Sequence, residues 1–256
     1  MRKVLSVAYG AAAYLIFLAV FAYLVAFVGD VLVPRSIDAG PASPAGTAIL
    51  VDVGLLALFA VQHSVMARRW FKERWTRLVP RHLERSTYVL AASLVLTLVM
   101  WGWRPLPAVV WSVDQPVATT VLDGLFWAGW GVVLLSTFLI DHFRLFGLKQ
   151  VWAAARGGDL EAPEFQTPGL YRWVRHPLYL GFLLAFWCTP TMTAGRALFA
   201  GVWTGWILLA IRLEERDLVR HHGDAYREYR RRVRKLVPLP KTVPDAVEGT
   251  APEARG

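Results

Sequence analysis

Residues 6–28 read SVAYGAAAYLIFLAVFAYLVAFV, a run of 23 residues without a charged side chain. About 20 apolar residues in a helix are enough to cross a bilayer. The run is longer than the apolar core of a secretory signal, and no cleavage pattern follows it. It therefore predicts a membrane-spanning helix that stays in the protein.

Five further apolar segments follow, and the last two are short and separated by little more than three residues. The chain is 55% hydrophobic with a mean hydropathy of +0.40, far above a soluble domain. We therefore expect an all-α, polytopic membrane helix bundle of about six apolar segments. The last two should form a tight hairpin that either just spans or is supported inside the protein, followed by a cytoplasmic helix or helix pair at 213–235. The five segments lie at residues 48–66, 87–103, 117–140, 178–193 and 197–211.

Three parts follow from this division. Residues 1–140 would form a four-span bundle on the substrate side, and residues 141–238 would hold a polar cofactor with a loop, the hairpin and the C-terminal helix. Residues 239–256 are rich in proline and small or acidic residues, so we expect a disordered tail.

Basic residues are distributed very unevenly along the chain. If the segments cross alternately, 25 of the 28 lysines and arginines lie on one side, and only Arg35, Arg104 and Arg196 lie on the other. The rule that positive loops stay inside then places both termini in the cytoplasm of a bacterial-type inner membrane. The net charge of +9 has this membrane explanation, so nucleic acid is not an expected partner. The bilayer is one.

The stretch Arg175-His176-Pro177-Leu178-Tyr179-Leu180-Gly181 stands where a polar loop enters the hairpin. Proline in a first helical turn costs no hydrogen bond, and the free backbone donors there, with Arg175 and His176, could hold a carboxylate or phosphate. The alternative is simple anchoring by positive charge.

Glu214 and Glu215 follow the sixth apolar segment directly. Carboxylates this close to a membrane are costly unless they are paired or face water. They could accept hydrogen bonds from ribose hydroxyls or an amino group. The alternative is salt bridging to Arg212 and Arg216.

Two histidines near the cytoplasmic ends of spans are candidate bases, because neutral imidazole can take a proton near neutral pH. His63 lies in the second span, and His142 follows Asp141 at the end of the fourth. An interhelical hydrogen bond for His63 and a solvated helix end for the Asp141–His142 pair are the alternatives. The single cysteine, Cys188, excludes a disulfide within the chain and a multi-cysteine metal site, and we expect no metal.

The C-terminal motifs resemble the isoprenylcysteine carboxyl methyltransferase family. They are Leu170-Tyr171, Arg175-His176-Pro177-x-Tyr179-x-Gly181, Glu214-Glu215 and Gly223-x-x-Tyr226-x-x-Tyr229, all within residues 167–238. The resemblance implies that this region binds S-adenosylmethionine on the cytosolic side. It implies further that the cofactor is held by Tyr171, Arg175, His176, Tyr179 and Glu214 or Glu215, with Tyr226 and Arg230 closing over it.

The rest of the chain resembles the NnrU-like membrane proteins and, more closely, the bacterial methanethiol S-methyltransferases. The residues concerned are Gln62-His63-Ser64-Val65-Met66-Ala67-Arg68, Glu84-Arg85-Ser86-x-Tyr88 and the block at 141–150. This resemblance implies an enzyme that methylates a small thiol, methanethiol, to dimethyl sulfide, with His63 or His142 as base and Asp141 orienting one of them. No obligate protein partner is implied.

Three other functions stay open at this point. One is a methyltransferase for a prenylated or other lipid-like substrate, and another is a reductase, since sterol reductases share a related C-terminal architecture and bind NADPH there. The third is an NnrU-like transport or assembly protein without methyltransferase activity. The repeated halves with broken helices that are typical of transporters are not found in this sequence.

The charge asymmetry makes the topology testable. A reporter fused after Glu253 or inserted near Lys72 is expected in the cytoplasm, and one inserted near Gly40 or Asp114 in the periplasm, because loops rich in lysine and arginine are retained inside. A pair of reporters active on opposite sides checks this. A periplasmic signal from the tail would overturn both the topology and the cytosolic cofactor route.

Overall fold

The computed structural model describes residues 2–158, 160 and 165–239 of the chain. The tail expected at 239–256 lies, apart from its first residue, outside the described residues.

Among the described residues, five helices are long and apolar enough to cross a membrane, which confirms the polytopic helical bundle. The fifth apolar segment forms α8 (Pro177–Trp187), of 11 residues. At 1.5 Å per residue it is about 16 Å long, roughly half the hydrocarbon thickness of a bilayer. It must therefore be supported inside the protein. The five long helices are α1 (Arg2–Gly29), α2 (Ala45–Ala67), α4 (Arg81–Gly102), α5 (Pro116–Ile140) and α9 (Ala194–Arg232).

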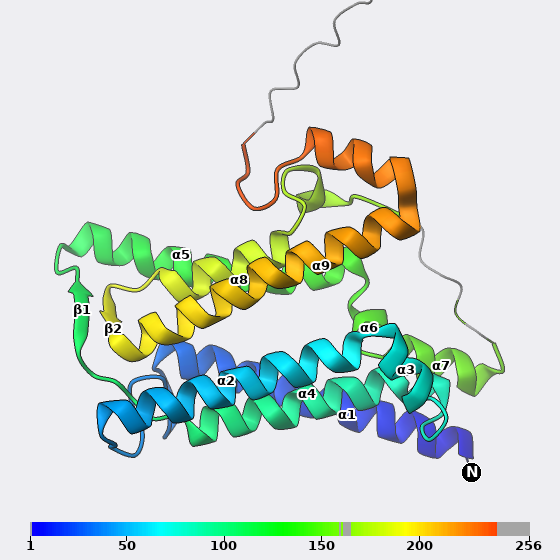
Figure 1. Ribbon diagram of the computed structural model, residues 1–256, viewed down its shortest axis with the longest axis horizontal. Coiled ribbons are helices and arrows are strands. Elements are labelled where there is room, and N and C mark those ends of the chain that lie inside the picture. Colours follow the sequence, from blue (N-terminus) through cyan, green and yellow to red (C-terminus); the bar gives the residue numbers. More distant parts are fainter. Residues whose placement is uncertain (1, 159, 161–164, 240–256) are drawn as a thin grey trace, which may run out of the picture.

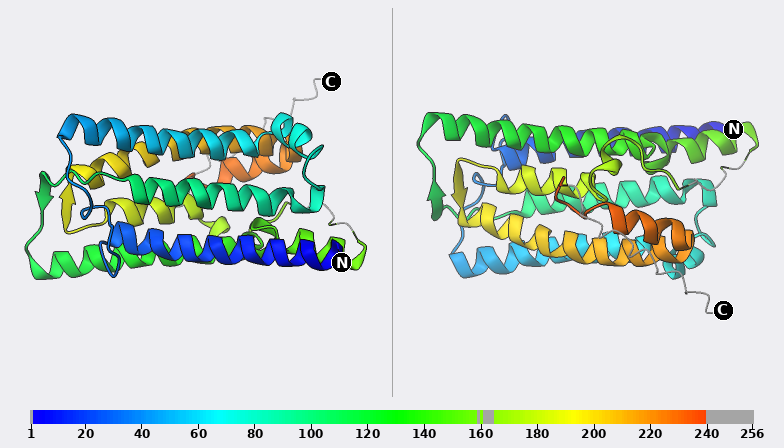
Figure 2. Two further views of the ribbon diagram at one scale, coloured as in Figure 1. Left: turned by 90° about the horizontal axis from the view of Figure 1, so that it is seen from below. Right: turned by 90° about the horizontal axis from the view of Figure 1, so that it is seen from above.

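The six helices form two layers (Figure 1). One layer holds α1, α4 and α2 side by side with α4 in the middle, and the other holds α5, α8 and α9 with α8 in the middle (Figure 2). Each central helix has a neighbour on both flanks. The hairpin partners α8 and α9 are adjacent as expected, but α8 packs most closely on α5.

Short elements close the two ends of the bundle. At the end that carries the N-terminus lie α3 (Arg69–Trp75), α6 (His142–Leu145) and α7 (Leu148–Arg156), and we call this the basic end (Figure 1). At the opposite end, β1 (Val109–Ser112) pairs antiparallel with β2 (Thr191–Thr193), in the register Val109–Thr193 and Ser112–Thr191. This small ribbon, which the sequence did not predict, joins the connection after α4 to the start of α9.

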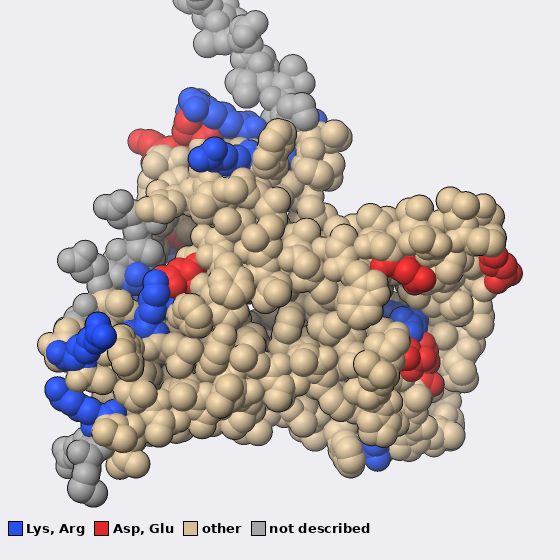
Figure 3. All heavy atoms as spheres, turned by 180° about the vertical axis from the view of Figure 1, so that it is seen from behind, with Lys and Arg blue, Asp and Glu red and all other residues tan. Residues whose placement is uncertain are grey.

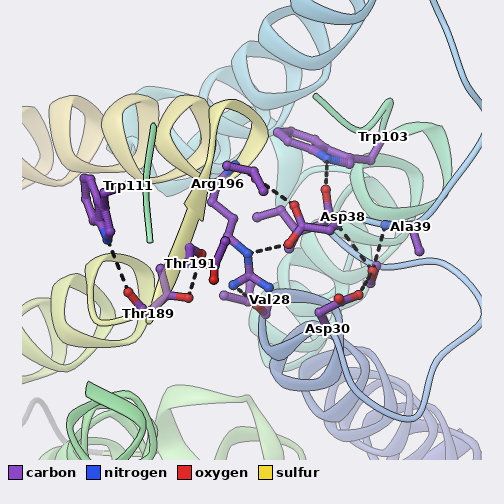
Figure 4. Close-up of polar contacts among 12 residues, drawn as sticks. Val28, Asp30, Asp38, Ala39, Trp103, Trp111, Thr189, Thr191 and Arg196 are labelled. Carbon is purple, nitrogen blue, oxygen red and sulfur yellow. Dashed lines mark hydrogen bonds and ion pairs between the residues drawn. The ribbon is translucent and has the colours of Figure 1, made fainter. Parts of the chain in front are cut away.

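A polar cluster at the ribbon end ties the layers together (Figure 4). Arg196 on α9 pairs with Asp38 at 2.5 Å between Nε and Oδ2, and it also donates to the carbonyl oxygen of Val28 at 2.9 Å. Thr193 donates to the other Asp38 oxygen, and the indole of Trp103 donates to Ile37. The loop between α1 and α2 is thereby fixed to the start of α9.

The last helix changes direction at Gly223, whose φ of 55° and ψ of −126° are not helical. Glycine tolerates this conformation because it has no Cβ. The turn sends the end of α9 back over the loop before α8 (Figure 1). The expected helix or helix pair at 213–235 is therefore a pair, whose first member continues the last membrane helix.

Charged side chains gather at the ends of the molecule (Figure 3). Lysines and arginines concentrate at the basic end and over the C-terminal part of α9, and uncharged surface lies between these regions and the ribbon end. This distribution is that of a protein with a membrane-embedded middle.

Two glycines let α5 and α8 approach closely. A Cβ at Gly129 would lie 2.7 Å from the carbonyl oxygen of Gly181, and a Cβ at Gly181 would lie 2.7 Å from that of Gly129. Small residues allow such backbone contact, which replaces the hydrophobic driving force that is lacking between helices in lipid. This contact supports the short helix α8.

Gly129→Ala should therefore destabilise the protein by roughly 1–3 kcal/mol, as expected for overpacking against backbone. Gly131→Ala on the same helix is the matched control, because a Cβ there meets nothing within 4 Å. Thermal unfolding in detergent measures both. Equal melting temperatures for the two variants would contradict the role of this contact.

Candidate functional site

A cavity of about 380 Å³ lies between the two layers and is lined by all six of their helices. Its wall is mainly apolar and aromatic, with a few polar side chains, as in sites for small molecules. It brings together seven of the residues that the sequence singled out, namely His63, His142, Tyr171, Arg175, His176, Tyr179 and Glu214. Asp141, Glu215, Tyr226 and Arg230 lie outside this lining.

Glu214 is the carboxylate of the cavity wall. Its side chain keeps 46% of its surface free although protein atoms surround it, because it faces the hollow interior. It accepts a hydrogen bond from the Tyr179 hydroxyl, and its Oε2 lies 3.9 Å from Nδ1 of His176. This group can accept hydrogen bonds from hydroxyl or amino groups of a ligand.

Tyr171, in the short 3₁₀ helix η1 (Gly169–Arg172), completes this polar region. Burial, with the nearby Glu214 carboxylate as a second cause, raises the pKa of the Tyr171 hydroxyl above its usual value. The hydroxyl therefore stays protonated at neutral pH and can donate a hydrogen bond.

Glu215 is not part of the cavity lining and is 4% exposed. Its Oε1 pairs with Arg175, 2.9 Å from Nε and 2.8 Å from Nη2, and lies 3.2 Å from Nε2 of His176. Arg230 approaches the other oxygen of Glu215 at 3.6 Å. The neighbouring carboxylates thus differ, since Glu214 faces the cavity and Glu215 joins protein segments.

Arg175 extends this network to the C-terminal segment. Its guanidinium donates to the carbonyl oxygens of Arg230 and Val233, and its backbone N–H donates to Arg234. His176 repeats the pattern with a backbone bond to Lys235. The segment after α9 is therefore held against the loop before α8, beside the polar region of the cavity.

Tyr226 and Tyr229, near the end of α9, pack against the loop before α8. Tyr226 is 1% exposed, lies against Phe165, and has no hydrogen-bond partner for its hydroxyl among the described residues. Tyr229, which the sequence did not single out as a site residue, donates to the carbonyl oxygen of Tyr171 at 2.5 Å. Its position in the motif Gly-x-x-Tyr-x-x-Tyr was the available signal.

His63 lies in the same cavity, on the other layer. Its Nε2 is 2.7 Å from the hydroxyl of Tyr88 on α4, and its ring packs against those of Phe59 and Trp206. Nδ1 is buried without a partner among the described residues. Tyr88 lines the cavity too and was missed as a site residue, although it belongs to a motif that carried the resemblance.

His142 has a partner on each ring nitrogen. Thr137 donates its proton to the carbonyl oxygen of Leu134, so it accepts from Nδ1–H of His142 at 2.8 Å. Nε2 then accepts from the Tyr14 hydroxyl at 2.8 Å. Burial lowers the pKa of His142 below its usual value of 6.5, so the ring is neutral at pH 7.

Asp141 stands at the junction of α5 and α6 with a left-handed φ of 112°. One carboxylate oxygen accepts from the backbone N–H of Arg144, and the other pairs with Lys149 at 2.6 Å. Thr137 and Tyr14, rather than Asp141, orient the His142 ring. Among the described residues no group of three or more His, Cys, Asp or Glu side chains could hold a metal ion.

Comparison with known proteins places the chain among methyltransferases. A family model described as "Protein of unknown function (DUF1295)" matches residues 74–233. The methanethiol S-methyltransferase of Mycobacterium tuberculosis is 56% identical over 240 residues, which cover 94% of this chain and 98% of that protein. Methanethiol S-methyltransferase 1 of Bradyrhizobium diazoefficiens is 50% identical over 241 residues, covering 94% and 85%. No solved structure has significant similarity to the chain.

Because the two carboxylates have different surroundings, we expect their removal to affect the stability of the protein differently. Glu215→Gln should lower stability by about 3–5 kcal/mol, because it leaves the buried Arg175 charge without its counter-ion. Glu214→Gln should change stability little, because that side chain faces the cavity. Thermal unfolding of both variants in detergent checks this, and a larger loss for Glu214→Gln would reverse the assignment.

Proposed function

The chain belongs to the methanethiol S-methyltransferase family, and on that premise we propose that it transfers a methyl group from S-adenosylmethionine to methanethiol, forming dimethyl sulfide. One observation carries the proposal. A single cavity joins the polar group of Tyr171, His176, Tyr179 and Glu214 to a mainly apolar wall with His63 and His142. Residues 141–238 would serve the cofactor and residues 1–140 the acceptor.

The polar region fits the chemistry of S-adenosylmethionine. Glu214 would accept hydrogen bonds from ribose hydroxyls or the amino group, and the Tyr171 hydroxyl would donate to an acceptor of the ligand. Arg175, Glu215 and Arg230 would hold this region in shape through their ion pairs, and Tyr226 would pack behind it. When bound, the cofactor supplies an electrophilic methyl group on a positively charged sulfur.

The opposite wall would receive the thiol. Methanethiol is apolar, so an aromatic wall inside a membrane protein suits it. A thiol is mostly protonated at neutral pH and becomes the better nucleophile when a base removes its proton. His63 and His142 are the candidate bases, and Asp141 contributes by holding the junction from which His142 projects.

The same proposal includes a location. We place the protein in the bacterial inner membrane with both termini in the cytoplasm, where S-adenosylmethionine is available. The gathering of basic side chains at the basic end and over the C-terminal part of α9 supports this orientation (Figure 3).

The function is tested with purified protein in detergent. Incubation with methyl-labelled S-adenosylmethionine and methanethiol should release labelled dimethyl sulfide into the headspace. A prenylated cysteine analogue and NADPH serve as alternative reagents, and S-adenosylhomocysteine but not NADPH should raise the melting temperature. Labelling of the prenylated analogue instead, or stabilisation by NADPH alone, would replace the proposal by one of the other functions.

The cofactor residues generate a sharper prediction. His176→Ala and Glu214→Gln should each weaken S-adenosylhomocysteine binding about tenfold or more, as expected for loss of a charged hydrogen bond of ~1.5–3 kcal/mol. His221→Ala is the control, because His221 is exposed on α9 and bonds only to its own helix. Calorimetry measures the affinities. Unchanged affinity in a folded His176→Ala variant would remove His176 from the binding site.

A further inference from the structure

Tyr88 pairs with His63 through its hydroxyl. Its oxygen lies 2.7 Å from Nε2 of His63 and 3.4 Å from the His63 carbonyl oxygen. When His63 carries its proton on Nδ1, Nε2 accepts the Tyr88 proton, because the shorter contact is the better hydrogen bond. The Tyr88 oxygen is then left with an acceptor lone pair, and no described residue donates a hydrogen bond to it. A hydroxyl in this state, on the wall of a cavity, can take one proton while it gives up another.

Tyr88 also lies across the cavity from the cofactor group. Tyr179 lines the same cavity and donates its own proton to Glu214. Tyr179 therefore does not donate to the free lone pair of Tyr88.

The second histidine pair differs in its placement. His142 also accepts a proton from a tyrosine, but Tyr14 is not part of the cavity lining. The other ring nitrogen of His142, Nδ1, donates a hydrogen bond to Thr137. A proton passed through Tyr14 would therefore not come from a molecule in the cavity.

We propose that Tyr88 and His63 form a proton relay that activates the thiol, with Tyr88 as the residue in contact with it. This inference rests on the proposed methyl transfer to a thiol. The thiol S–H proton passes to the Tyr88 oxygen while the Tyr88 proton passes to Nε2 of His63. The sulfur lone pair forms the new carbon–sulfur bond, and the pair of the breaking bond stays on the cofactor sulfur, which becomes neutral. The His63 imidazolium later releases its proton to water.

The charged neighbours of the relay are few. On α4 they are Arg85, whose guanidinium lies 5.0 Å above the Tyr88 ring, and Glu84. Across the cavity, α8 presents Tyr179 with its partner Glu214 from α9. The positive charge of Arg85 favours negative charge on the Tyr88 oxygen during the transfer.

The test compares rates of dimethyl sulfide formation against pH. Tyr88→Phe and His63→Ala should each bind S-adenosylhomocysteine as the wild type does but react about 10²-fold more slowly at pH 7. Above pH 7 the variants should gain about tenfold per pH unit, because the thiol then ionises without help, whereas the wild-type rate should stay nearly constant. The double variant should be no slower than either single one, since the two residues act as one unit.

Two hydroxyl deletions separate this relay from its alternatives. Tyr9→Phe removes a hydroxyl that bonds to the neighbouring Thr87 outside the cavity, and it should leave the rate unchanged. A pH-dependent loss in Tyr14→Phe with none in Tyr88→Phe would overturn the relay in favour of His142, and a pH-independent loss in Tyr88→Phe would reduce Tyr88 to packing. If the wild-type protein forms no dimethyl sulfide, the result contradicts the proposed function rather than the relay. The wild-type measurement alone is enough to show this.

Discussion

The buried ion pair between Arg175 and Glu215 joins segments 40 positions apart, and the polar half of the cavity depends on it. Two charges with about 5% of their surface exposed are costly to bury alone, so each requires the other. Once paired, they fix the loop before α8 to α9, and the remaining donors of Arg175 hold the segment that follows α9. His176 and Glu214 are adjacent in sequence to the pair, so the pair determines where they project.

The architecture explains why one cavity has two chemical characters. Its two layers come from different parts of the chain, with α1, α2 and α4 in one and α5, α8 and α9 in the other (Figure 2). The second layer, with the η1 segment that precedes α8, contributes the carboxylate and two of the tyrosines, and the first contributes a mainly aromatic and aliphatic wall with one histidine–tyrosine pair. Polar and apolar walls thus meet in a space that neither layer encloses alone.

The short helix α8 shows how membrane packing serves the site. A half-length helix has too little apolar surface to span the bilayer, and its stability comes from backbone contact with α5 at Gly129 and Gly181. Its first turn begins at the buried Pro177, which sets His176 and Tyr179 beside the cavity. The ribbon of β1 and β2 and the Asp38–Arg196 pair secure the opposite end (Figure 4).

The sequence by itself determined the local properties: the long apolar helices, the uneven charge, and the motif positions of His63, His176 and Glu214. These follow from hydropathy and spacing, which act over a few neighbouring residues. Only the tertiary structure decided which of the two adjacent carboxylates faces the cavity. It alone decided which histidine is paired with a tyrosine that also lines the cavity, and that Tyr88 belongs to the lining. The physical reason is that each of these depends on a hydrogen-bond partner 25 to 128 positions away, and such a pairing exists only after the helices have packed.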